Sequence, residues 1–134
     1  MLRMSSAPPR TVEAPARARR LCERACREWG FDRLHDVCAL LVSELVTNAV
    51  LHGTGAVEVE LRSEGACLHV GVRQFDRVLE LPDVHMSGPD AVRGRGLAMV
   101  ERLAADWGAE VAPQGSTVWF ELRRAPDRIA GDLG

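Results

Sequence analysis

The sequence has no lysine and no tyrosine among its 134 residues, so all 17 basic residues counted as Lys or Arg are arginine. Without lysine, P-loop nucleotide-binding proteins, Schiff-base enzymes and kinases with a strand lysine are excluded, because each depends on a lysine amine. A formal net charge of -2 offers no basic surface for nucleic acid or an anionic membrane. We therefore expect neither as a direct partner.

A cysteine framework and a membrane-spanning run are also missing. The four cysteines contain no C-x-x-C pair, and Cys22 and Cys26 are expected to be small apolar residues on one helix face. No uninterrupted apolar run approaches the ~20 residues of a membrane span, and the N-terminus lacks the apolar region of a signal peptide. These features predict a reduced, cytoplasmic protein.

Turn residues and apolar periodicity divide the chain into one domain with loose ends. Residues 1–10 are predicted to be a flexible N-terminal arm, residues 11–123 the domain, and residues 124–134 a flexible tail. Two helices are expected first, one from Thr11 to Gly30 and one from Asp32 to His52. The second helix carries apolar residues on more than one face, which predicts a central, buried helix.

After residue 55 the apolar period changes to two. Residues 57–61 and 68–72 form a predicted hairpin, followed by a long loop over residues 75–95. A third helix is expected over residues 97–107, ended by Gly108, and a second hairpin joins residues 110–112 and 116–123. This order predicts an α+β fold, a two-layer sandwich of a mixed or antiparallel sheet with helices on one face.

The second predicted helix bears three polar residues in line, Glu44, Asn48 and His52, at spacing i, i+4 and i+8. Asn48 is the only asparagine in the sequence. Such a stripe on an apolar helix is either a site that faces a cavity or a solvated edge with local capping. In the first case it offers a carboxylate as a base and an amide oxygen for Mg²⁺.

A glycine pair precedes the third predicted helix. Gly94, Arg95 and Gly96 would allow the backbone to approach a ligand, and the amides of a helix start favour phosphate. The third glycine and the preceding strand of a dinucleotide-binding fingerprint are missing, so a Rossmann fold is excluded.

Three motifs together resemble the RsbW/SpoIIAB-type anti-sigma factor serine kinases of the GHKL superfamily. They are SELVTNAVLHG from Ser43, GRGLAMVERLAADWG from Gly94 and GSTVWFEL from Gly115. The resemblance covers about Pro15 to Leu122 and implies a Bergerat ATP-binding fold.

The same resemblance implies a set of site residues. Glu44 would be the general base and Asn48 would ligate Mg²⁺ beside ATP. The remaining residues implied to contact the nucleotide, mostly through its phosphates, are Gly94, Arg95, Gly96, Leu97 and Thr117. The implied activity is ATP-dependent phosphorylation of a serine on a STAS-type anti-sigma factor antagonist, combined with inhibition of a sigma factor by a homodimer.

One position departs from the family. Where the family has an aspartate that accepts the adenine amino proton, the strand here has Gln74, and Asp76 stands where a glycine is expected. Either Gln74 contacts the base through its amide, or a two-residue shift places Asp76 there on the same strand face.

This departure leaves alternative functions open. Weakened or lost nucleotide binding would make the protein a catalytically impaired binding module that regulates transcription through protein partners. A third hypothesis, the ATPase half of a two-component histidine kinase, has the least support, because no phosphoacceptor domain is recognisable.

Overall fold

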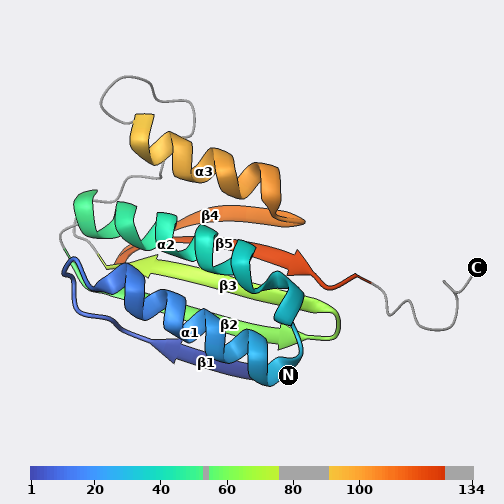
Figure 1. The fold of residues 1–134 in the computed structure, drawn as a ribbon. Coiled ribbons are helices and arrows are strands. Elements are labelled where there is room, and N and C mark those ends of the chain that lie inside the picture. Colours follow the sequence, from blue (N-terminus) through green and yellow to red (C-terminus); the bar gives the residue numbers. More distant parts are fainter. Residues whose placement is uncertain (53–54, 76–90, 126–134) are drawn as a thin grey trace, which may run out of the picture.

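A computed structural model describes residues 1–52, 55–75 and 91–125, with the backbone alone for residues 52 and 91–96. A five-stranded sheet and three α-helices make up this part of the chain (Figure 1). In chain order the elements are β1 (Leu2–Ser6), α1 (Ala14–Trp29), the 3-10 helix η1 (Asp32–Leu34), α2 (His35–His52), β2 (Val57–Glu64), β3 (Cys67–Gln74), α3 (Ala91–Leu103), β4 (Asp106–Ala112) and β5 (Gly115–Arg123).

The strands lie in the order β1-β2-β3-β5-β4, and every neighbouring pair is antiparallel. All three helices cover one face of this sheet (Figure 1). The predicted α+β two-layer sandwich is therefore confirmed, and among the described strands the antiparallel alternative holds. Both predicted hairpins are present, since β2 pairs with β3 and β4 pairs with β5.

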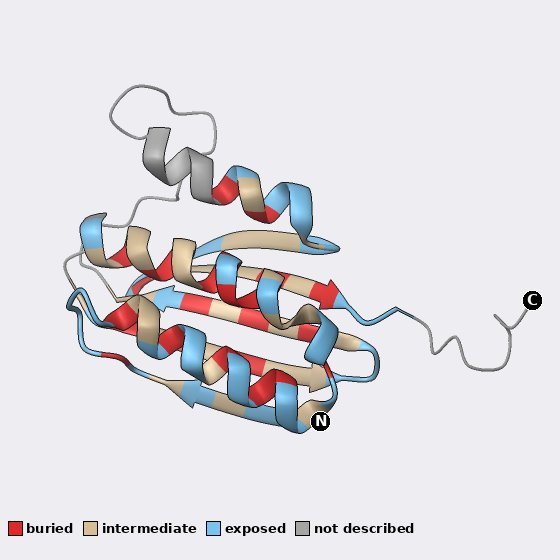
Figure 2. Cartoon of the chain, in the orientation of Figure 1, coloured by how far each residue is buried: buried red, intermediate tan, exposed pale blue. Residues whose placement is uncertain are grey.

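The core lies between the helices and the sheet (Figure 2). Alternate residues along most of β2 and β3 are buried, from Val57 to Leu61 and from Leu68 to Val72, which turns one face of each strand toward the helices. The segment Asp32–Leu51, with a mean hydropathy of 1.5, is long and apolar enough to cross a membrane. Seven of its apolar residues are nevertheless buried in the core, among them Leu41, Val42, Leu45 and Val46. The segment is thus the central helix that its apolar pattern predicts.

The first ten residues differ from the predicted flexible arm, because Leu2–Ser6 forms the edge strand β1. Met4 packs against the core, and the Arg3 guanidinium lies 3.4 Å from the Glu60 carboxylate on β2. Arg10 donates a 2.8 Å hydrogen bond to the carbonyl of Val50, near the C-terminal end of α2, where a cation is favoured by the helix dipole. The strand β1 is short and half polar, so the alternation of apolar and polar residues along it indicates a strand only weakly.

The start of the predicted tail is also held in place. The Arg124 amide donates to the Ala66 carbonyl at 2.8 Å, and its guanidinium donates to the Gly30 carbonyl at 3.2 Å. The same guanidinium lies 5.0 Å from the ring centroid of Phe31. Arg124 therefore belongs to the folded domain, and residues 126–134 lie outside the described residues.

The third helix begins and ends earlier than predicted. It covers Ala91–Leu103, and Trp107 and Gly108 belong to β4 rather than to the end of a helix. Gly108 pairs with Trp119 on β5. A Cβ at position 108 would lie 2.7 Å from the indole ring, so only glycine fits there without a shift of the ring. The glycine thus marks a close cross-strand contact, whereas the sequence pattern interpreted it as a helix stop.

We expect Gly108→Ala to lower the free energy of unfolding by about 1–3 kcal/mol, because the added methyl group overlaps the Trp119 ring. Gly71, on the other side of Trp119 in β3, is the matched control. A Cβ at Gly71 meets only the Thr117 Cγ2 atom at 3.9 Å, so Gly71→Ala should change stability by much less. Urea unfolding measures the stability of both variants. Equal losses of stability would show that the contact with the Trp119 ring is not the reason for glycine at position 108.

Three cysteine thiols meet between α1 and α2, and all three residues are buried: Cys22, Cys26 and Cys38. Hydrogen bonding of the Cys38 thiol, as donor, to Cys22 and Cys26, followed by burial, raises the pKa of Cys38 well above its ordinary value. The predicted role of Cys22 and Cys26 as small apolar residues on a helix face agrees with this burial.

Candidate functional site

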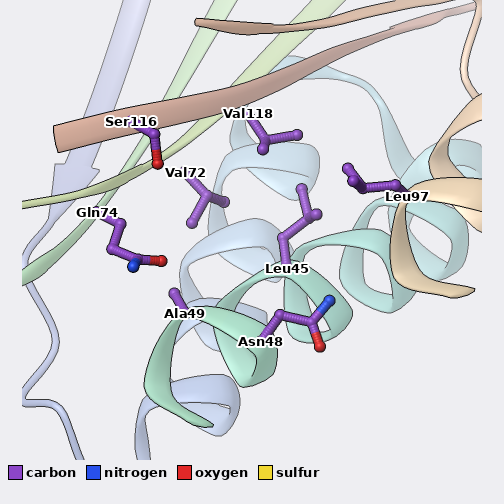
Figure 3. A pocket seen from close by; sticks show the side chains of 8 residues that line it. All are labelled: Leu45, Asn48, Ala49, Val72, Gln74, Leu97, Ser116 and Val118. Atoms are coloured by element: carbon purple, nitrogen blue, oxygen red, sulfur yellow. The ribbon is translucent and has the colours of Figure 1, made fainter. Parts of the chain in front are cut away.

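A cavity opens between the sheet and the C-terminal half of α2, with α3 at its side (Figure 3). The space between its walls is about 430 Å³, part of which is open to solvent. Its walls come from α2, β3, α3 and β5 and consist of Leu45, Asn48, Ala49, Val72, Gln74, Leu97, Ser116 and Val118. Three of the predicted nucleotide contacts, Asn48, Gln74 and Leu97, thus meet in one cavity although they lie on different elements.

Helical spacing brings Asn48 to the cavity. Leu45, Asn48 and Ala49 lie at i, i+3 and i+4, so they share the face of α2 that looks onto the sheet. Leu45 and Ala49 are buried, whereas Asn48 is half-buried at the rim. Within the part of the chain that the structure describes, the Asn48 side chain has no hydrogen-bond partner. Its amide is therefore available to a ligand.

Strand alternation brings Gln74 and Ser116 to the same end of the cavity (Figure 3). The two residues are direct partners in the β3–β5 ladder, and both are half-buried. Val72 and Val118, two residues away on each strand, share their face and form the apolar floor. Of the two residues predicted as alternatives for the contact with the base, Gln74 lines the cavity. The other, Asp76, lies outside the described residues.

The other predicted residues of α2 and α3 border this cavity. Glu44 lies one turn before Asn48 on α2, is half-buried, and is not among the residues that line the cavity. Leu97 lines it from α3. Gly94, Arg95 and Gly96 precede Leu97 on the same helix, three residues or more inside its start at Ala91. The prediction that the glycine pair opens the helix therefore fails, since helices tolerate an interior glycine at a cost of about 1 kcal/mol.

Thr117 lies on the opposite face of the sheet from the cavity. Its hydroxyl accepts a 3.4 Å hydrogen bond from the Arg73 guanidinium, and its cross-strand neighbour on β4 is Glu110. Ser116 occupies the cavity face instead, a residue that the sequence analysis missed. The apolar alternation of Val118, Phe120 and Leu122 is the signal that assigns Ser116 to the inner face and Thr117 to the outer one.

Among the residues whose side chains the structure describes, the eight that line the cavity are all neutral. Its polar groups are two amides and one hydroxyl, which supply both donors and acceptors. Among the described residues no group of three His, Cys, Asp or Glu side chains could hold a metal ion.

The sequence from residue 7 to residue 122 matches the protein family described as the histidine kinase-like ATPase domain. The fold is similar to that of the histidine kinase domain from Erythrobacter litoralis EL346 blue-light activated histidine kinase, with a TM-score of 0.54 and 18% identity over 88% of this chain. The chain spans 65% of the length of that structure. No curated protein sequence matches the chain. Because the family match covers most of its length, the protein belongs to the histidine kinase-like ATPase domain family.

Proposed function

We propose that the protein binds ATP with Mg²⁺ in the cavity beside α2 and transfers the γ-phosphate to a serine of another protein. The observation that carries this proposal is the amide of Asn48, which faces the cavity from the only asparagine of the sequence. Its neutral, largely apolar walls suit a purine base. Membership of an ATPase domain family supports the same ligand.

The side chains present fit Mg²⁺. This ion is usually held by one or two protein oxygens together with substrate phosphates and water, rather than by a cage of protein side chains. Asn48 would supply such an oxygen, and the described residues contain no competing cluster of His, Cys, Asp or Glu. When bound, Mg²⁺ would neutralise part of the charge on the phosphates.

The remaining groups have roles that follow from their position in the chain. Leu97 lines the cavity from α3, and Gly94 to Gly96 lie just before it in the same helix, where the absence of a side chain at the two glycines would let phosphate approach the backbone. Glu44 would accept the proton of the attacking serine hydroxyl. Positioning and charge stabilisation would then provide most of the rate.

Replacing Asn48 by alanine is expected to weaken ATP binding by about 10–100-fold in the presence of Mg²⁺ and to change it little in EDTA. The reason is that the variant removes one metal ligand and leaves the base end of the cavity intact. Calorimetric titration with and without Mg²⁺ measures the difference. The control is Thr47→Ala, at the neighbouring position of α2 that does not line the cavity. An affinity of Asn48→Ala equal to that of the parent would reject the assignment.

We also propose that the substrate is a STAS-type anti-sigma factor antagonist and that the protein inhibits a sigma factor, as a cytoplasmic homodimer. The support is the resemblance of the three motifs beginning at Ser43, Gly94 and Gly115 to RsbW/SpoIIAB-type kinases. The test is incubation of the purified protein with radiolabelled ATP and a STAS-type antagonist, followed by mapping of the phosphorylated residue. Phosphate on a serine of the antagonist is the expected result.

A second candidate function is a regulatory binding module without phosphotransfer. Two observations favour it: no charged side chain of the described residues lines the cavity, and Glu44 is not among the lining residues. The two candidates differ in one measurement, because a module of this kind would fail to bind ATP in the calorimetric titration while still binding its protein partners.

A further inference from the structure

The three thiols between α1 and α2 have no part in the proposed nucleotide site. Cys22 and Cys26 lie at i and i+4 on α1, so they share one buried face of that helix, and Cys38 lies opposite them on α2. The Cys38 thiol donates hydrogen bonds to both, so its sulfur is in contact with each of the other two. All three cysteines are free thiols. Two thiols held in contact on different helices are the starting arrangement for a disulfide.

Cys26 is the one of the three that lines a hollow in the protein surface. The hollow lies where α1, η1 and α2 meet, and its other lining residues are Glu23, Arg27, Asp32 and His35. Neither Cys22 nor Cys38 lines it. Its polar side chains suit water and polar solutes of similar size, whereas an exposure of 1% at Cys26 keeps larger molecules away. A small oxidant such as hydrogen peroxide therefore reaches Cys26 before it reaches either of the other two thiols.

The hydrogen bond between the two helices also prepares Cys26 for reaction. The bond that Cys38 donates lowers the pKa of the Cys26 thiol, against the opposing effects of burial and of the Asp32 carboxylate. Donation to Cys22 and to Cys26, together with burial, raises the pKa of Cys38. Because the thiolate is the reactive form of cysteine, Cys26 is the nucleophile of the pair and Cys38 remains protonated beside it.

We propose that Cys26 and Cys38 form a modification site for hydrogen peroxide, at which oxidation joins α1 to α2 by a reversible disulfide. In the first step the Cys26 sulfur attacks one oxygen of the peroxide, the O–O bond breaks, and the thiol proton leaves with the second oxygen as water. The product is a sulfenic acid on Cys26. In the second step the Cys38 sulfur attacks the Cys26 sulfur, the S–O bond breaks, and the released hydroxyl takes the Cys38 proton as water. Two thiols are thus oxidised and one peroxide is reduced to two molecules of water.

Peptide mapping of the folded full chain after treatment with hydrogen peroxide tests this site independently of nucleotide binding. Trypsin cleaves after arginine, and arginines at positions 24, 27 and 33 separate Cys22, Cys26 and Cys38 into different peptides. Free thiols are alkylated before digestion. We expect the peptides of Cys26 and Cys38 to be joined, with the loss of two hydrogen atoms, and to separate again in dithiothreitol. A link between Cys22 and Cys38, or no link in the folded protein, overturns the proposal.

Cys67 on β3 is the internal control of the same experiment. It is half-buried, so it is more exposed than Cys26, and it lies outside the group of three thiols. If exposure alone decided the reaction, Cys67 would be oxidised first. We expect Cys67 to react more slowly than Cys26, because it lacks the hydrogen bond from Cys38. Oxidation of Cys67 ahead of Cys26 overturns the proposal.

Serine variants assign the two roles within the pair. Cys38→Ser removes the second thiol, so the sulfenic acid on Cys26 should persist and be trapped by dimedone. Cys26→Ser should abolish the disulfide, whereas Cys22→Ser, the matched control on the same helix face, should still form it. Circular dichroism verifies that the variants fold, and the mapping of the parent protein does not depend on them. A disulfide between α1 and α2 in folded Cys26→Ser, or none in folded Cys22→Ser, overturns the proposal.

Discussion

Replacing Gly115 by alanine is expected to destabilise the protein by about 3–5 kcal/mol, a large part of the stability of a domain of this size. Gly115 begins β5 with a φ of 152°, a backbone conformation that residues with a side chain rarely adopt. A Cβ there would overlap the carbonyl oxygen of Gln74 and would lie 2.9 Å from the Cα of Phe75. Relief would require the ends of β3 and β5 to separate, because both obstacles are backbone atoms.

Gly65 provides the matched control for this substitution. It also lies in a hairpin turn at positive φ, 61°, but a Cβ there meets nothing within 4 Å. Gly65→Ala should therefore cost only the conformational penalty of about 1–2 kcal/mol. Urea unfolding of the two variants separates steric overlap from conformational strain. Similar losses for both would mean that the close approach between Gly115 and Gln74 contributes nothing.

Changing Glu44 to glutamine is expected to slow phosphotransfer by about 10²–10⁴-fold and to leave ATP affinity within a few fold of the parent. The substitution removes the base while keeping the shape of the side chain. Glu44 is also not among the residues that line the cavity, so nucleotide binding should not depend on it. Transfer from radiolabelled ATP to an antagonist protein measures the rate, and calorimetry measures the affinity.

Asp36→Asn is the control for Glu44→Gln, because it removes a carboxylate from the exposed first turn of the same helix. Its rate should equal that of the parent. If Glu44→Gln transfers phosphate as fast as Asp36→Asn, then Glu44 is not the general base and another group must accept the serine proton.

Most of the architecture was predictable from periodicity. The two hairpins and α2 follow from strong apolar patterns, and Gly30 ends α1 in the left-handed conformation, with a φ of 78°, as a C-terminal glycine should. Elements with weak apolar patterns were not predictable in this way. β1 has five residues and one partly buried apolar side chain that packs on the core, Met4, so its strand state depends on pairing with β2.

Glycine was the least reliable signal in the sequence. Gly94 and Gly96 were interpreted as a helix start and Gly108 as a helix stop, although the first two lie inside α3 and the third lies in β4. The reason for Gly108 is the Trp119 ring on the neighbouring strand. Such a contact depends on strand register, which a local pattern does not contain.

Only part of the candidate site was predictable from the sequence, because strand register is again not contained in a local pattern. The spacing on α2 singled out Asn48, and the resemblance to the kinase family singled out Gln74, because both depend on local order along the chain. Ser116 joins them only through the β3–β5 ladder, in which it is the direct partner of Gln74. Choosing between Ser116 and Thr117 required the inner face of β5, and the apolar residues Val118 and Phe120 were sufficient for that choice.

The most direct test of nucleotide binding in the cavity is a titration of the isotope-labelled protein with ATP and Mg²⁺, followed by the backbone amide shifts in NMR spectra. We expect the amides of Asn48, Gln74 and Ser116 to shift together, with one dissociation constant. The amides of Glu58 and Glu60, whose side chains line a hollow on the opposite face of the sheet, should remain in place. Shifts confined to that opposite face, or no shifts at all, would contradict the assignment of this cavity as the nucleotide site.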